Sequence, residues 1–179
     1  VHMTLSQADS FDNPDFALID IDPEPPLGYD DVVNVALLVK ETMDELGLKC
    51  YVKTSGKKGL HVLVPVAPGY TCRQTRDFVY QIGMRLARES ETVVSEFSHS
   101  RDPGTLFIDY TQNSHGKTMV CPYSVRATPK ATVSTPLEWD QIRKGLYPEA
   151  YNILTLREIE ANPWKFLPGD TQKLEVNWK

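Results

Sequence analysis

Hydrophobic residues recur along the chain with two periods, one typical of helices and one typical of strands. Apolar residues at every third or fourth position predict two amphipathic helices, at about 30–46 and 71–88. Apolar, β-branched runs bounded by turn residues predict strands. These runs cover residues 16–22, 49–55, 60–66, 92–98, 105–110 and 117–124.

Turn residues separate these elements and indicate how they connect. The glycine-rich segment 55–59 lies between two short strands, which predicts a hairpin. Farther along, Thr135 and Thr155 are each followed three residues later by a glutamate, a pattern that predicts two short capped helices. The tail after Pro163 is expected to be irregular. This order predicts an α+β fold, with a mainly antiparallel or mixed sheet and flanking helices.

Composition is that of one ordinary globular domain over residues 1–179, with 41% hydrophobic and 24% charged residues. No apolar run approaches the ~20 residues of a membrane span, so no membrane association is expected. The first residues lack a basic stretch followed by an apolar one, which argues against a signal peptide. The three cysteines, Cys50, Cys72 and Cys121, are expected to be free thiols. A cytoplasmic, nucleoid-associated location is expected.

Charge is distributed unevenly in a chain whose formal net charge is −5. The net value argues weakly against a nucleic-acid partner. Two segments, 46–76 and 110–137, nevertheless contain basic residues and no acidic one. Chance clustering is one interpretation of this pattern. The other is a phosphate-facing surface beside an acidic site.

Three carboxylates stand at the ends of apolar runs. Asp20 and Asp22 are two positions apart in a predicted strand, so their side chains point the same way and repel each other. Asp109 ends another apolar run. Hard divalent cations prefer carboxylate oxygens and would offset this repulsion. Converging carboxylates therefore predict a site for one or two Mg²⁺ or Mn²⁺ ions that supports phosphoryl transfer.

The basic turn complements the carboxylates, since Ser55 and Lys58 offer donors to phosphate oxygens and Gly56 lets the backbone approach a ligand. Downstream, Arg126 can bind a triphosphate oxygen with two donors. Each feature also has a structural interpretation: a surface Asp pair, an exposed turn, a core histidine at His61. From the residues alone, both metal-dependent phosphoryl or nucleotidyl chemistry and these structural interpretations remain open.

Taken together, three segments resemble a known family. They are "IDIDPEP", "KTSGKKGLHVLVPV" and "FIDYTQNSHGKTMVCPYSVRATPKATVSTPLEWDQI". In order and spacing they are similar to the polymerase domain of bacterial ligase D, a member of the archaeo-eukaryotic primase superfamily. The resemblance extends from the first residues to about residue 170 and implies a primase-like α+β core.

The resemblance also implies roles for individual residues. It identifies Asp20, Asp22 and Asp109 as the catalytic carboxylates that hold two Mn²⁺ or Mg²⁺ ions. The residues that would bind the incoming nucleotide are Ser55, Gly56, Lys58, His61, Gln112, Lys117 and Arg126. The implied activity is addition of nucleotides, often ribonucleotides, to primer ends in non-homologous end joining. The implied partners are DNA primer-template or DNA ends, NTP or dNTP, a DNA ligase and Ku.

Only nineteen residues precede Asp20, whereas the family domain has a long segment there. The amino-terminal part of the family domain, with its basic residues for a 5′-phosphate, is therefore expected to be absent. Two other hypotheses stay open: a non-catalytic fragment that binds nucleotide or DNA ends, and a metal-dependent phosphatase or nuclease. Ribose preference and oligomeric state do not follow from the sequence.

Overall fold

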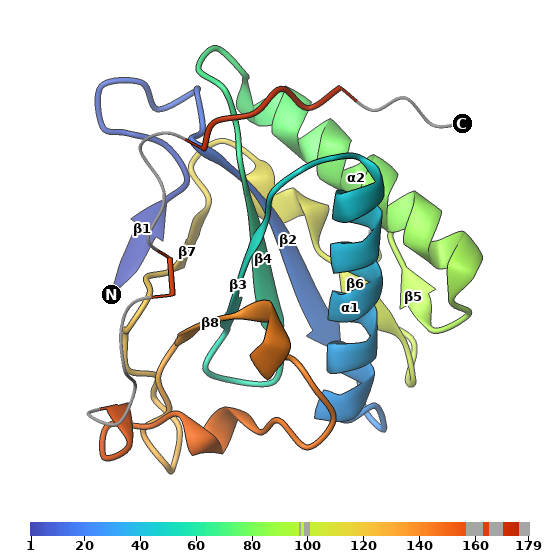
Figure 1. The fold of residues 1–179 in the computed structure, drawn as a ribbon, viewed down its shortest axis with the longest axis vertical. Coiled ribbons are helices and arrows are strands. Elements are labelled where there is room, and N and C mark those ends of the chain that lie inside the picture. The colour runs from blue at the N-terminus through green and yellow to red at the C-terminus, as the bar shows by residue number, and fades with distance from the viewer. Residues whose placement is uncertain (97, 99–100, 157–162, 165–169, 176–179) are drawn as a thin grey trace.

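The structure is a computed structural model that describes residues 1–96, 98, 101–156, 163–164 and 170–175 (Figure 1). Within these ranges a six-stranded sheet forms the centre of the molecule. Its strands are β2 (Phe16–Pro23), β3 (Tyr51–Thr54), β4 (Leu60–Pro65), β5 (Val93–Val94), β6 (Leu106–Ile108) and β8 (Pro136–Leu137). Their order is β5-β6-β2-β4-β3-β8. Neighbouring strands are antiparallel, except that β5 and β6 are parallel.

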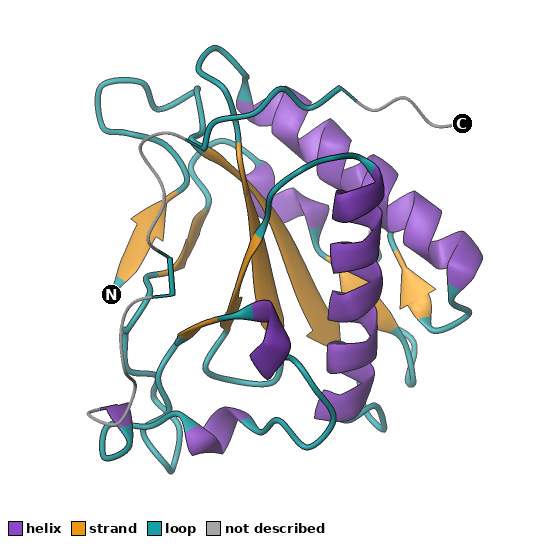
Figure 2. Cartoon of the chain, viewed as in Figure 1, coloured by secondary structure: helices purple, strands orange, loops and turns teal. Residues whose placement is uncertain are grey.

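Two helices, α1 (Tyr29–Glu45) and α2 (Cys72–Glu89), pack on one face of this sheet (Figure 2). Alternation along β2 decides which residues meet them. Ala17, Ile19 and Ile21 are fully buried in the core that the helices share with the sheet. The amino terminus of α2 is capped as the sequence predicts, because Thr71 and Gln74 exchange hydrogen bonds.

The opposite face of the sheet is divided into an apolar part and a polar part. In the apolar part Leu18 and Leu63 pack against Met119, beside a second sheet of two antiparallel strands. These strands are β1 (His2–Thr4) and β7 (Thr118–Val120). Farther along β2 the same alternation places Asp20 and Asp22 on this face. One face thus builds the core, and the other presents polar side chains.

The predicted α+β class, both helices and the hairpin of β3 and β4 are confirmed. Of the described residues in the strand expected over 92–98, Val93–Val94 pair as β5. The expected strands at 105–110 and 117–124 are shortened to β6 and β7. Strand β1 carried no clear signal in the sequence. Within the described ranges no helix combines the length and apolarity that crossing a membrane requires.

The prediction of a helix that starts at Thr135 is wrong, because Pro136–Leu137 pairs with β3 instead. The carbonyl oxygen of Thr135 accepts a hydrogen bond from the backbone of Thr54, so the segment is part of the sheet edge. Three short 3₁₀ helices occur in the described chain: η1 (Tyr110–Asn113), η2 (Trp139–Gln141) and η3 (Pro148–Ala150). The helix predicted from Thr155 falls mostly outside the described residues. All three cysteines are free, as expected.

Candidate functional site

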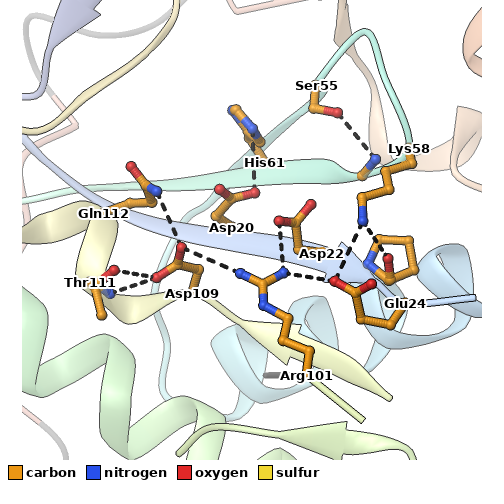
Figure 3. A network of polar contacts seen from close by, with 12 residues as sticks. Asp20, Asp22, Glu24, Ser55, Lys58, His61, Arg101, Asp109, Thr111 and Gln112 are labelled. Atoms are coloured by element: carbon orange, nitrogen blue, oxygen red, sulfur yellow. Dashed lines mark hydrogen bonds and ion pairs between the residues drawn. The ribbon is translucent and has the colours of Figure 1, made fainter. Parts of the chain in front are cut away.

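Strand register places three ionisable residues in a row across the polar face. His61 on β4 lies opposite Lys53 on β3 and opposite Asp20 on β2. Directly opposed residues share a face, so the three side chains are neighbours. The Nε2 atom of His61 is 3.4 Å from Oδ1 of Asp20 (Figure 3). The apolar residues that alternate with them hold this row in place from the core side.

Asp109 joins this row from the end of β6. Its backbone N–H donates to the carbonyl oxygen of Asp20 at 2.9 Å. Its carboxylate accepts hydrogen bonds from the N–H (3.0 Å) and hydroxyl (2.6 Å) of Thr111 and from Nε2 of Gln112 (3.2 Å). Asp109 therefore caps η1 and faces the other carboxylates at the same time (Figure 3).

Arg101 lies among the carboxylates. Its Nη1 donates to Asp22 (3.1 Å) and to Glu24 (3.3 Å), and its Nη2 is 4.0 Å from Oδ2 of Asp109 (Figure 3). The guanidinium also stacks over the ring of Phe107, with Cζ 4.6 Å from the ring centroid. One cation thus bridges acidic residues from β2 and β6.

Burial and crowding shift the proton affinities of the row. Burial, with the charges of Asp22 and Asp109, raises the pKa of Asp20 to about 8, although Lys53 and Arg101 act in the opposite direction. A carboxyl with this pKa is mostly protonated at neutral pH. The site therefore holds a proton that any cation binding at Asp20 would have to displace.

The other two members of the row lose protons more easily than usual. Burial lowers the pKa of Lys53 to about 7, while Asp20 partly offsets the effect. The Lys53 ammonium is fully buried and donates to Oγ of Ser134 at 2.6 Å. Burial, with Lys53 and Arg126, also lowers the pKa of His61 well below its ordinary value. Among described residues, Nδ1 of this neutral imidazole is buried and has no hydrogen-bond partner.

The turn between β3 and β4 needs glycine at two positions. Gly56 has a φ of +71°, and a Cβ there would lie 2.6 Å from Cγ of Arg126. A Cβ on Gly59 would collide with the carbonyl oxygen of Ile21. The turn is therefore pressed between the Arg126 side chain and strand β2, which fixes its position beside the carboxylates.

Side chains of the turn hold its shape and extend toward β2. The hydroxyl of Ser55 accepts hydrogen bonds from the N–H groups of Lys57 (3.2 Å) and Gly59 (3.1 Å). The ammonium of Lys58 donates to the carbonyl oxygen of Pro23 at 2.8 Å and lies 3.6 Å from Glu24 (Figure 3). A cationic group is thus already placed at the end of the strand that carries Asp20.

Of the ten residues selected from the sequence, nine lie among the clustered carboxylates and His61, on η1 or around the β3–β4 turn. The exception is Lys117, which is exposed just before β7 and lines a small cavity with Leu5, Ser6 and Phe11. The structure does not connect it with the others.

Sequence reasoning missed three residues of the network: Lys53, Arg101 and Glu24. Glu24 continues the two-residue spacing of Asp20 and Asp22, so the signal was present in the sequence. To identify Lys53, one has to know the register of β3. To identify Arg101, one has to know the path of the chain between β5 and β6. The sequence pattern specifies neither.

The donor set meets part of what a divalent cation needs. No group of three His, Cys, Asp or Glu side chains within the described ranges is arranged as a ready metal site. Arg101 occupies the space between Asp22 and Asp109. The donors are nonetheless hard carboxylate oxygens, which suit Mg²⁺ and Mn²⁺. Burial, together with the charges of Asp22 and Asp109, raises the pKa of Asp20. The residues fit a divalent cation by their chemistry, with Arg101 displaced.

Carboxylates suit divalent cations and a glycine- and lysine-containing turn suits phosphates, and both lie on one face of the sheet. The chain belongs to the family described as LigD, primase-polymerase domain, whose model matches residues 1–164.

Individual proteins to which the chain is similar are themselves LigD proteins. The chain is 32% identical over 173 residues to the multifunctional non-homologous end joining protein LigD of Pseudomonas aeruginosa, covering 93% of this chain and 21% of that protein. It is 32% identical over 141 residues to the bifunctional LigD of Bacillus subtilis, covering 78% of this chain and 23% of the relative. The chain thus spans about a fifth of the length of these relatives.

A solved structure supports the same fold. The polymerase domain of Mycobacterium tuberculosis ligase D, in complex with DNA, matches with a TM-score of 0.69 and 25% sequence identity. The match covers 84% of this chain and 57% of that one. The predicted primase-like core is confirmed by this likeness.

Proposed function

We propose that this chain is a primase-type nucleotidyltransferase that adds nucleotides or ribonucleotides to a primer end during DNA end joining. The observation that carries the proposal is the convergence of Asp20, Asp22 and Asp109 beside the Ser55–Gly59 turn, in a member of the LigD primase-polymerase family. The relatives named above act in end joining by their own descriptions.

Asp20, Asp22 and Asp109 would hold the divalent cations, two Mn²⁺ or Mg²⁺ ions. Bound there, such ions supply neutralising charge at the phosphates and lower the pKa of the attacking hydroxyl. Binding would replace the Arg101 contacts to Asp22 and Asp109 and remove the proton from Asp20. Proton release on metal binding is therefore part of the proposal.

The turn and its neighbours would orient the triphosphate for in-line attack by the primer 3′-hydroxyl. Lys58 and Arg126 would neutralise its negative charge, and His61 would help to orient it. Gln112 would keep Asp109 oriented through its 3.2 Å hydrogen bond. Because Gly56 has no side chain, the Arg126 side chain can occupy the space beside it.

The proposed partners are a DNA primer-template or DNA end, an NTP or dNTP, a DNA ligase and Ku. The structural neighbour from M. tuberculosis is in complex with DNA, which supports the DNA assignment. The basic residues of segments 46–76 and 110–137 that lie at the site give it the charge a phosphate backbone needs.

The test is primer extension on a gapped, 5′-phosphorylated duplex with Mn²⁺, with rNTPs and dNTPs in parallel. We expect extension by the wild-type chain and a loss of at least ~10³-fold in Asp20→Asn and Asp109→Asn, which keep the side-chain shape but remove charge. Circular dichroism of both variants establishes that they are folded. Full activity in either variant would refute the metal assignment.

Two other outcomes separate the alternatives. Nucleotide binding by calorimetry without any extension would identify a non-catalytic binding fragment. Shortening of the primer, or release of phosphate from its 5′ end, would identify a nuclease or phosphatase that uses the same carboxylates.

A further inference from the structure

A cavity of about 690 Å³ lies at the end of the sheet where the β3–β4 turn meets the start of α1. Its walls come from four segments of the chain: residues 23–29, the turn residues 56–58, residues 128–132 and residues 147–149. Figure 1 shows these segments together at one end of the molecule. We call this cavity the hairpin pocket.

The hairpin pocket is apolar inside and basic at its edge. Pro25, Leu27 and Tyr29 line it from the start of α1. Pro129 and Pro148 line it from the other side. Its volume falls within the range of about 300–1,000 Å³ that is usual for pockets that bind small organic groups.

Three lysines belong to the lining, against a single acidic residue, Glu149. Lys58 already contacts Pro23 and Glu24. Lys57 and Lys130 are exposed, and within the described part of the chain neither forms an ion pair. The charge of the pocket edge is therefore available to an anion.

Tyr147 adds an aromatic surface at the same edge. Tyr147 belongs to the lining and is 60% exposed, whereas tyrosines are on average of intermediate burial. An exposed aromatic ring beside free lysines is the combination that proteins use to bind unpaired nucleotides. The base stacks on the ring, and the phosphate meets the lysine.

The hairpin pocket adjoins the proposed nucleotide site but is distinct from it. Gly56 and Lys58 belong to both, whereas Ser55, His61 and Asp20 do not line the pocket. We propose that the hairpin pocket binds one unpaired nucleotide of a nucleic-acid strand, with its base against Tyr147 and the prolines and its phosphate between Lys57 and Lys130. The proposal rests on the proposed function only in taking the ligand to be a nucleic-acid strand. Charge decides against an apolar peptide, which would have no use for the lysines.

The test measures binding of a fluorescein-labelled single-stranded oligonucleotide by anisotropy, without metal or nucleotide. Tyr147→Ala should weaken binding by ~5-fold or more, and Tyr147→Phe, which keeps the ring, should retain wild-type affinity. Lys130→Glu should weaken binding and reduce the slope of log affinity against log salt by about 1. The matched control is Lys173→Glu, an exposed lysine outside the pocket lining, which should leave binding unchanged.

A direct readout accompanies the affinities. An oligonucleotide with 5-iodouracil at its unpaired end should photo-crosslink to Tyr147, identified by mass spectrometry. Crosslinking at other aromatic residues alone would overturn the assignment. Unchanged oligonucleotide affinity in both Tyr147→Ala and Lys130→Glu would also overturn it and would leave the pocket to a protein partner.

Two further measurements separate this site from the proposed polymerase site. ATP binding with Mn²⁺, measured by calorimetry, should be the same in Tyr147→Ala as in the wild type. A loss there would show that the pocket is part of the nucleotide site and would overturn the proposal. Competition by AMP at stoichiometric concentrations would assign the pocket to free nucleotides and would overturn the strand assignment. Intact strand binding without primer extension would refute the proposed function alone.

Discussion

Asp20 is the residue at which the chemistry of the site and the stability of the fold conflict. Its pKa is raised from 3.8 to about 8. Between pH ~4 and ~8 the folded protein therefore keeps a proton that the unfolded chain releases, so the stability of the cation-free protein falls as pH rises through this window. Asp20→Asn removes the titrating group. From pH 4 to pH 8, the unfolding free energy of the wild type should therefore fall by ~1 kcal/mol or more relative to that of Asp20→Asn.

Urea unfolding in EDTA at pH 4, 6 and 8 measures this difference. The control is Asp9→Asn, at an exposed position in the amino-terminal loop, which should follow the wild type at every pH. If the unfolding free energies of Asp20→Asn and the wild type changed in parallel with pH, the raised pKa of Asp20 would be refuted.

Lys53 should act on Asp20 through its charge. The buried ammonium lowers the pKa of Asp20, and no solvent screens the interaction because Lys53 is fully buried. Lys53→Met keeps most of the length of the side chain and removes its charge, so the pKa of Asp20 should rise further. A ¹³C NMR titration of the Asp20 carboxyl checks this, with the exposed Lys49→Met as the control. An unchanged Asp20 titration in Lys53→Met would show that the two groups do not interact.

Single residues were predictable from the sequence where one strand or one turn sufficed. Asp20 and Asp22 share a face because they are two apart, and Gly56 was selected because a turn beside a ligand needs glycine. The contact of His61 with Asp20 depends on the register of β2 and β4. The position of Arg101 among the carboxylates depends on the connection between β5 and β6, so no local pattern could predict it.

The β3–β4 turn is the element whose shape the site requires most directly. Gly56→Ala places a Cβ in the left-handed region and against Arg126, and it should destabilise the fold by ~1–3 kcal/mol. Displacement of Arg126 should also weaken binding of ATP. Urea unfolding and calorimetry with ATP and Mn²⁺ measure the two effects.

Gly69 provides a matched control for this variant, because its φ is also positive, at +97°, but its Cβ would meet no atom within 4 Å. Gly69→Ala should lose stability through backbone strain alone and should keep wild-type affinity for ATP. If Gly56→Ala bound ATP as tightly as Gly69→Ala does, the turn would have no part in nucleotide binding.

Elements were predictable where they carry a strong internal period. Both long helices and the β2 strand have one, and the structure confirms them. The segment after Thr135 has a good helix cap but pairs with β3, because the sheet edge offers its backbone hydrogen-bond partners that a short helix cannot match. Strand β1 is three residues long and exists through its pairing with β7, so its own sequence carries little signal.

At the scale of the whole molecule, the fold gathers only part of the charge that the sequence segregates. Lys53, Lys58 and Arg126 from the two basic segments reach the site or its border. Lys49 instead pairs with Asp170, and Lys117 lies apart before β7. A chain of net charge −5 thus presents a locally cationic surface beside a locally acidic site.

Binding of Mn²⁺ to that acidic site should stabilise the entire fold, because the unfolded chain has no such cluster. At a concentration 100 times the dissociation constant the gain is about 2.7 kcal/mol, or roughly 5–10 °C in Tm for a chain of this size. At one fixed Mn²⁺ concentration, the stabilisation should be larger at pH 8 than at pH 5.5, because the metal competes with the proton on Asp20. Differential scanning fluorimetry with Mn²⁺ and with EDTA measures it. Asp109→Asn should lose most of the shift, and an equal shift in that variant would place the ion elsewhere on the molecule.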